Sequence, residues 1–129
     1  MLVIRDDGHV MGSVSGGCVE DDLIAKVKAH QLASGKPETA TYGVTEEEAR
    51  RYGLPCGGTI QLVLEPLTKD SGMRALLREI EAGHLVARRL DLLTGEATLH
   101  PAQAVDGLTF DGATLQTIHG PRYRMLVIG

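Results

Sequence analysis

Strand patterns and helix patterns alternate along this chain, and glycine or proline separates most of them. Two short apolar runs, residues 2–5 and 10–14, predict strands joined by a turn at residues 6–8. Apolar residues at helical spacing then predict a helix over residues 19–33, and residues 39–42 predict another short strand. Alternating strands and helices are typical of an α/β fold, so we expect a mixed β-sheet flanked by helices in a single domain.

A short helix and a long strand are predicted next. Thr45 and Glu48 have the spacing of a capping box, and Gly53 marks the end of the helix that they begin. Residues 59–67 form a continuous β-rich apolar run, which predicts a central strand of the sheet.

The rest of the chain predicts one more helix and several strands. The helical pattern covers residues 72–82, with Asp70 or Ser71 as the capping residue and Gly83 at the end. The strand patterns that follow cover residues 85–93, 97–100 and 113–118.

The composition excludes several classes of function. With 129 residues the chain is long enough for one hydrophobic core. A net charge of −4, three tyrosines, one phenylalanine and no tryptophan argue against a surface for nucleic acid or for an anionic membrane. Residues 5–7 interrupt the first apolar run, and no run approaches the roughly 20 residues that span a bilayer. We therefore expect a cytoplasmic protein with reduced thiols.

The two cysteines of the chain both adjoin a glycine pair. The segments are Gly16-Gly17-Cys18 and Cys56-Gly57-Gly58, in near-mirror order. Glycine removes side-chain bulk, so a ligand can approach the sulfur and the backbone N–H groups together. In the first segment a strand leads through Ser15 to a predicted helix start, whose free N–H groups suit an anion and favour a thiolate. The acidic residues 20–22 oppose that effect.

Simpler interpretations of these residues stay open at this point. A cysteine is often an inert apolar residue, and a glycine pair often marks only a turn. A zinc site is not expected, because the chain has no C-x-x-C spacing and its histidines are scattered.

At these two segments the chain resembles the XdhC/CoxI family, the accessory proteins of xanthine dehydrogenase and related molybdenum hydroxylases. The resemblance rests on residues 12–20, with the sequence GSVSGGCVE, and on residues 53–60, with the sequence GLPCGGTI. It is clear over residues 1–67 and continues as a pattern to the terminal strand.

The resemblance implies a chaperone that binds the molybdenum cofactor, assists its sulfuration with a cysteine desulfurase and delivers it to a xanthine dehydrogenase-type enzyme. It also implies that Cys18 and Cys56 contact this molybdopterin cargo, including its molybdenum. The backbone cradle that it implies consists of Ser15, Gly16, Gly17, Gly57 and Gly58. We therefore expect binding and hand-over rather than enzymatic turnover.

The resemblance also implies a domain organisation. Residues 125–129 resemble the first strand of a dinucleotide-binding unit, and family members continue there into a Rossmann-like domain. We expect an XdhC/CoxI-like domain over residues 1–120 and the start of a Rossmann-like domain over residues 121–129, in a chain truncated at both ends. Unpaired apolar edges at residues 2–4 and 125–128 would favour a homo-oligomer.

Two other functions remain open from the sequence. In the first, Cys18 is a nucleophile or persulfide carrier of a sulfur-transfer enzyme. In the second, Cys18 and Cys56 form a redox-sensitive pair in a structural domain.

Overall fold

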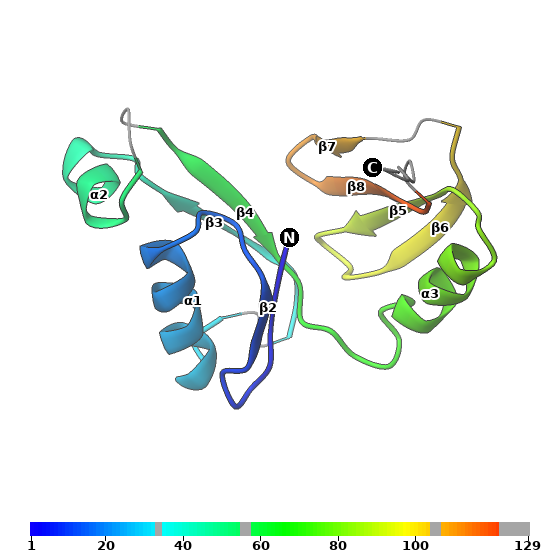
Figure 1. Ribbon diagram of the computed structural model, residues 1–129, viewed down its shortest axis with the longest axis horizontal. Coiled ribbons are helices and arrows are strands. Elements are labelled where there is room, and N and C mark those ends of the chain that lie inside the picture. Colours follow the sequence, from blue (N-terminus) through cyan, green and yellow to red (C-terminus); the bar gives the residue numbers. More distant parts are fainter. Residues whose placement is uncertain (33–34, 55–57, 104–106, 122–129) are drawn as a thin grey trace, which may run out of the picture. The chain divides into compact units, whose positions relative to one another are not determined.

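The computed structural model describes residues 1–32, 35–54, 58–103 and 107–121 of the chain. The chain divides into two compact units, Met1–Pro66 and Leu67–Gly129 (Figure 1). The sequence predicted a single domain around one sheet. Each unit instead has its own antiparallel sheets and its own buried residues.

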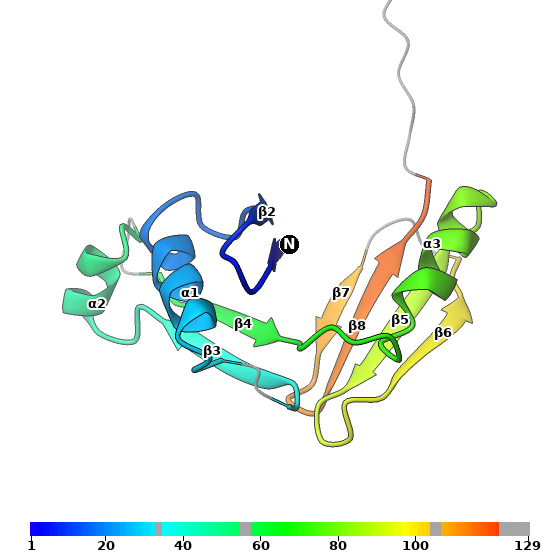
Figure 2. The same ribbon diagram turned by 90° about the horizontal axis from the view of Figure 1, so that it is seen from below.

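The first unit contains two hairpin-like sheets and two helices. In chain order its elements are β1 (Leu2–Ile4), β2 (Val10–Gly12), α1 (Cys18–Lys28), β3 (Glu38–Tyr42), α2 (Glu46–Arg51) and β4 (Ile60–Leu64). β1 pairs antiparallel with β2, and β3 pairs antiparallel with β4, so that Tyr42 lies opposite Ile60. Figure 2 shows α1 lying along the β3–β4 pair.

One side of α1 forms the core of the first unit. Val19 and Leu23 are 0% and 2% exposed and pack with Tyr42, which is 4% exposed. The partly buried residues around them come from both sheets, from the loops that flank α1 and from the end of α2: Leu2, Ile4, Val14, Leu32, Ala40, Tyr52, Leu54, Leu62 and Leu64. The helix is therefore fixed by burial on its apolar side, and its first residue, Cys18, directly precedes the most buried one.

The second unit is a four-stranded antiparallel sheet with one helix. Its elements are α3 (Met73–Glu81), β5 (Val86–Asp91), β6 (Ala97–Pro101), β7 (Leu108–Phe110) and β8 (Thr114–His119). The strand order is β6-β5-β8-β7, which makes β5 and β8 the two inner strands. Figures 1 and 2 both place α3 beside β5 and β6.

The side of β5 that faces α3 is buried. Val86, Arg88 and Leu90 alternate along the strand and are at most 5% exposed. The guanidinium of Arg88 donates a 3.0 Å hydrogen bond to the carbonyl of Ser71, just before α3 begins. This bond ties the start of the helix to the centre of the sheet.

All three helices end in the same way. A left-handed residue, His30, Gly53 or Gly83, follows each helix by two positions. In α1 the N–H groups of residues 30 and 31 donate back to the carbonyls of Val27 and Lys26, which closes the last turn. The predicted ends at Gly53 and Gly83 are therefore confirmed. The first helix, expected to reach residue 33, ends at Lys28 because His30 has a φ of 54°.

Several other predictions are corrected. The expected mixed sheet is absent from the described residues, where all strand pairs are antiparallel. β4 is not a central strand over the part of the chain that the structure describes, where it pairs with β3 in a two-stranded sheet. Neither Asp70 nor Ser71 caps α3; Gly72 does so in a left-handed conformation, while the Ser71 hydroxyl accepts a hydrogen bond from the Thr68 N–H.

The C-terminal part of the chain contains a strand that the sequence did not predict. This strand, β7 (Leu108–Phe110), has three residues. The expected first strand of a Rossmann-like domain lies at residues 125–129, outside the described residues, and stays a prediction. Over the described ranges, none of the helices is long and apolar enough to cross a membrane.

Candidate functional site

The segment between β2 and α1, residues 13–17, forms a tight loop that we call the Cys18 loop. The carboxylate of Glu20, in the first turn of α1, lies at the centre of this loop. One oxygen accepts hydrogen bonds from the Ser13 hydroxyl at 2.7 Å and from the N–H groups of residues 14, 15 and 16 at 2.8, 2.8 and 2.9 Å. The other accepts from the Gly17 N–H at 3.0 Å and from the Ser15 hydroxyl. Four consecutive backbone N–H groups thus converge on one side chain.

This environment strongly favours the ionised form of Glu20. Partial desolvation raises the pKa of this carboxyl group. The hydrogen bonds from Ser15 and Ser13 and from the loop N–H groups lower the pKa, and together they outweigh the desolvation. The net result is a pKa well below the usual range of a glutamate. The Cys18 loop is therefore an anion-binding loop, as the sequence predicted, but its anion is a side chain of the protein itself.

Cys18 stands directly after this loop. It is the first residue of α1 and carries an exposed free thiol. The loop is held by Glu20 on one side of Cys18, and Val19 is fully buried on the other. The thiol is therefore presented to solvent from a backbone that is anchored at both sides.

A polar contact holds the body of α1 on β3. The hydroxyl of Tyr42 donates a 2.8 Å hydrogen bond to Asp22, and Lys26 lies 2.6 Å from the same carboxylate oxygen. Burial and this hydrogen bond raise the pKa of Tyr42 to about 12. The ring of Tyr42 also meets Tyr52 edge to face, with centroids 4.9 Å apart. This contact fixes the angle at which α1 approaches the β3–β4 pair.

The second cysteine segment is described only in part. Cys56 and Gly57 lie outside the described residues, and a pocket shared by the two sulfurs stays a prediction. Gly58 is described and exposed. A Cβ added to Gly43 would lie 2.5 Å from the Gly58 carbonyl oxygen, and the Thr59 hydroxyl donates to the Gly43 carbonyl at 3.1 Å.

These contacts relate Gly58, the described residue of the second motif, to the core that surrounds the start of α1. Gly43 directly follows Tyr42, the residue that β3 contributes to the core around Val19. Gly58 lies two residues before Ile60, which is paired with Tyr42. The start of α1 and the residues that flank the second motif therefore both adjoin the same end of the β3–β4 pair.

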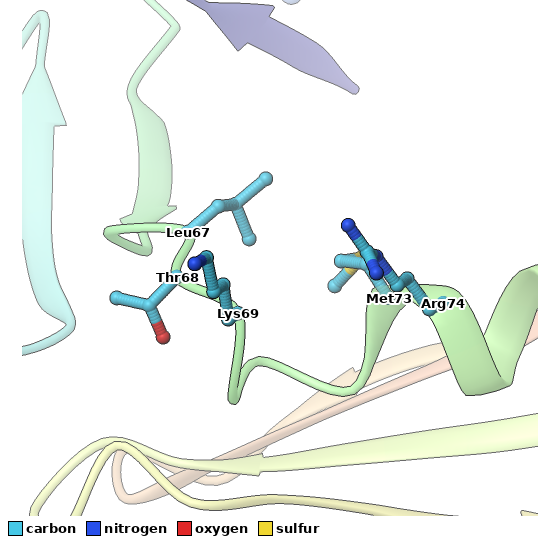
Figure 3. Close-up of a pocket in the computed structure, with 5 residues that line it drawn as sticks. All are labelled: Leu67, Thr68, Lys69, Met73 and Arg74. Carbon is cyan, nitrogen blue, oxygen red and sulfur yellow. The ribbon is translucent and has the colours of Figure 1, made fainter.

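A pocket is found elsewhere, in the second unit. It has a volume of about 470 Å³ and is lined by Leu67, Thr68, Lys69, Met73 and Arg74 (Figure 3). It combines two cationic side chains with two apolar ones, and it contains none of the residues that the sequence analysis selected. We assign no ligand to it.

The structure gives Glu20 a position at the candidate site that the sequence did not predict. Glu20 was considered only as an acid that opposes a thiolate. Its position three residues after Gly17 is the spacing at which a glutamate reaches back to the start of a helix, and this was the available signal. Of the predicted cradle residues, Ser15, Gly16 and Gly17 all donate their N–H groups to this carboxylate. Among the described residues, no cluster of three or more metal-ligating side chains occurs.

Comparisons with known proteins bear on this site. The model of the XdhC and CoxI family matches residues 1–43, which include β1, β2, the Cys18 loop, α1 and β3. The molybdenum cofactor insertion chaperone PaoD of Escherichia coli (strain K12) is 31% identical over 130 residues, covering 99% of this chain and 39% of PaoD. The chain thus spans about two fifths of the length of this curated relative. No solved structure matches the chain. The resemblance to the XdhC and CoxI family, first indicated by the two cysteine motifs, is confirmed by the family model and by this relative.

Proposed function

We propose that this chain takes part in the insertion of the molybdenum cofactor into a molybdoenzyme, as a chaperone that binds the cofactor as cargo. The proposal follows from the similarity to PaoD, whose name states this function, over nearly the whole chain. One structural observation supports Cys18 as a residue that contacts the cofactor: it is an exposed free thiol at the start of a well-anchored helix.

The chemistry of the cargo suits this thiol. A molybdenum–dithiolene centre is soft, and thiolate sulfur is the soft ligand among protein side chains. A thiol that binds and later releases cargo must be accessible, which an exposed Cys18 is. Its neighbouring backbone must also keep its position when the cargo leaves, and the hydrogen bonds of Glu20 supply that restraint.

The glycines of the Cys18 loop are not assigned to a phosphate-binding site. The N–H groups of Ser15, Gly16 and Gly17 already donate to Glu20, so we assign them to shaping the loop rather than to holding a phosphate. Gly16 has a φ of 81°, which favours glycine, and no described atom lies within 4 Å of a Cβ placed there. The open space on this side leaves room for cargo beside Cys18. Cys56, Gly57 and Gly58 remain the proposed second contact.

The test is an anaerobic titration of the protein with molybdenum cofactor, measuring the molybdenum that stays bound after desalting. Near-stoichiometric molybdenum on the wild type, lost in Cys18→Ala and in Cys56→Ala with unchanged melting temperature, supports the proposal. Full retention by both variants contradicts the assigned site. The chain spans only part of PaoD. If the wild type retains no molybdenum, the same titration is therefore repeated with a full-length relative and with its two equivalent cysteine variants.

The exposure of Cys18 also favours a second function, in sulfuration of the cofactor. In that reaction the Cys18 thiolate attacks the outer sulfur of a cysteine desulfurase persulfide. A new sulfur–sulfur bond forms at Cys18, and the desulfurase cysteine leaves as its thiolate. Incubation with desulfurase and cysteine, followed by peptide mass spectrometry, would then show one added sulfur atom on Cys18. An unmodified Cys18 beside a persulfidated desulfurase contradicts this role.

The proposed client is a xanthine dehydrogenase-type enzyme, and a homo-oligomer is proposed for the chaperone itself. Activation of the cofactor-free enzyme by the loaded chaperone tests the first point. Light scattering of the purified protein, compared with and without bound cofactor, tests the second.

A further inference from the structure

We propose that Glu20 is the positioning residue of the Cys18 loop, and that its carboxylate excludes external oxyanions from the backbone beside the thiol. This inference rests on the proposed function of Cys18 as the cargo-contacting residue. It also explains which ligands the site prefers. The loop does not bind phosphate, so the cargo is contacted through the sulfur of Cys18.

The geometry of the Cys18 loop carries this inference. Loops with several converging N–H groups before a helix bind phosphate in many proteins, because the N–H groups lack partners within the chain. In this loop the N–H groups of residues 14–17 all have a partner, and the partner is one carboxylate at 2.8 to 3.0 Å. Both serine hydroxyls of the loop donate to it as well. An incoming phosphate would have to displace a fully hydrogen-bonded anion.

The same bonds restrain Cys18. Glu20 lies two residues after Cys18 on the first turn of α1, and all its hydrogen-bond donors lie before Cys18. The carboxylate therefore closes a ring of backbone around the cysteine. Among the described residues, the side-chain hydrogen bonds found between this loop and α1 all end on Glu20, so its removal would release the loop from the helix.

Asp21 provides a matched control. It lies next to Glu20, carries the same charge, is exposed, and makes none of these loop contacts. Asp21→Asn and Glu20→Gln each remove one negative charge from the first turn of α1. Only the second changes the group at the centre of the loop, where one oxygen remains as a neutral amide acceptor and the other is replaced by an NH2 donor. The pair therefore separates loss of charge from loss of hydrogen bonds within the loop.

The experiment measures two properties of the purified chain without molybdenum. The first is hydrogen exchange of the N–H groups of residues 14–17 by NMR. The second is the rate at which iodoacetamide alkylates Cys18, followed by peptide mass so that Cys56 does not interfere, with inorganic phosphate or with chloride at equal ionic strength.

The inference predicts a specific combination of results. Glu20→Ala accelerates exchange at residues 14–17 by about tenfold or more, as expected when bonds to a charged acceptor are lost. Glu20→Gln accelerates it less, because one neutral amide oxygen still accepts hydrogen bonds there. The exchange protection of α1 itself is retained in Glu20→Gln, which serves as the folded variant if Glu20→Ala unfolds. Phosphate slows alkylation of Cys18 most in Glu20→Ala, whose loop N–H groups have lost their acceptor, and less in Glu20→Gln, which keeps one amide oxygen there. It has no effect in the wild type or in Asp21→Asn.

Two outcomes would overturn the inference. One is unchanged exchange at residues 14–17 in every folded Glu20 variant, which would mean that the side chain of Glu20 does not hold the loop. The other is an equal phosphate effect in the wild type, in Asp21→Asn and in the Glu20 variants, which would mean that Glu20 excludes nothing. Neither measurement uses the cofactor, so they fail or succeed independently of the molybdenum titration above.

Discussion

The Tyr42 hydroxyl donates a 2.8 Å hydrogen bond to the carboxylate of Asp22, and this bond links β3 to α1 across the core of the first unit. Asp22 lies on the same helix as Cys18 and Glu20, one turn further along. The position of the thiol therefore depends on two anchors. Glu20 holds the loop before it, and the contact between Tyr42 and Asp22 holds the helix behind it.

Tyr42→Phe tests the second anchor. The substitution keeps the buried ring and removes only the donor to Asp22. Hydrogen bonds to charged groups contribute about 1.5 to 3 kcal/mol, so we expect a loss of that order in the free energy of unfolding. Chemical denaturation followed by circular dichroism measures it. Tyr52→Phe is the control, because no hydrogen bond of the Tyr52 hydroxyl is found among the described residues; an equal loss in both variants would contradict the assignment.

The same contact predicts a dependence on alkaline pH. The pKa of Tyr42 is raised from 10.0 to about 12 by burial and by the bond to Asp22, and the pKa of Lys26 is also raised, chiefly by Asp22. Groups with a raised folded pKa contribute stability that is present below the unfolded pKa and is lost as the pH rises through the folded one. Stability should therefore fall between about pH 10 and 12, as measured by denaturant midpoints. A fall of the same size in Tyr42→Phe would show that another group is responsible.

Gly43 and Gly53 form a matched pair for the second motif. Both have a positive φ, of 80° and 63°. A Cβ at Gly53 meets nothing within 4 Å, whereas a Cβ at Gly43 would lie 2.5 Å from the Gly58 carbonyl oxygen. Gly53→Ala should cost only the conformational strain, about 1 to 2 kcal/mol. Gly43→Ala should cost clearly more in unfolding free energy, and should weaken molybdenum retention by displacing the residues beside Cys56. Equal costs would show that the approach of Gly58 to Gly43 is unimportant.

Leu23→Ala tests whether burial of one side of α1 drives the fold of the first unit. Leu23 is 2% exposed, and truncation of a buried leucine costs about 2 to 5 kcal/mol. Val44 lies in the same unit but is 69% exposed, so Val44→Ala should change the free energy of unfolding by less than about 0.5 kcal/mol. Thermal and denaturant unfolding of the two variants compare these effects directly. A small effect of Leu23→Ala would place the core elsewhere.

Cys18→Ser separates function from stability. The thiol is exposed and has no assigned role in packing, so its replacement should leave the melting temperature nearly unchanged. Molybdenum retention should fall, because a hydroxyl is a harder and much less acidic ligand than a thiol. A large drop in melting temperature would instead support a structural role for this cysteine.

Local features of the fold were predictable from the sequence because neighbouring residues create them. The turn at residues 6–8, the start of α2 at Thr45 and the helix ends at Gly53 and Gly83 all depend on contacts within a few positions. The Thr45 hydroxyl accepts from the Glu48 N–H at 3.2 Å, as the capping pattern indicates. The carboxylate of Glu48, however, accepts from the Val44 N–H rather than from that of Thr45.

Features that depend on distant residues were not predictable in the same way. The apolar run at residues 59–67 indicated a central strand, because periodicity reports burial and not the number of partners. The structure has β4 in a two-stranded sheet, where α1 and the end of α2 provide the burial that neighbouring strands would otherwise give.

The candidate site also has features that the sequence predicts and features that depend on distant contacts. The sequence by itself determined the chemistry of the site: two thiols beside glycine pairs, in motifs that resemble one family, together with the residue types able to form an anion-binding loop. Only the tertiary structure decided that Glu20 fills this loop and that Cys18 faces solvent. Which donors surround a carboxylate depends on how the chain bends in space. Burial of Val19 and Leu23 sets which side of α1 faces the core, and Glu20, on the first turn of the same helix, meets donors from residues 13–17 that precede it.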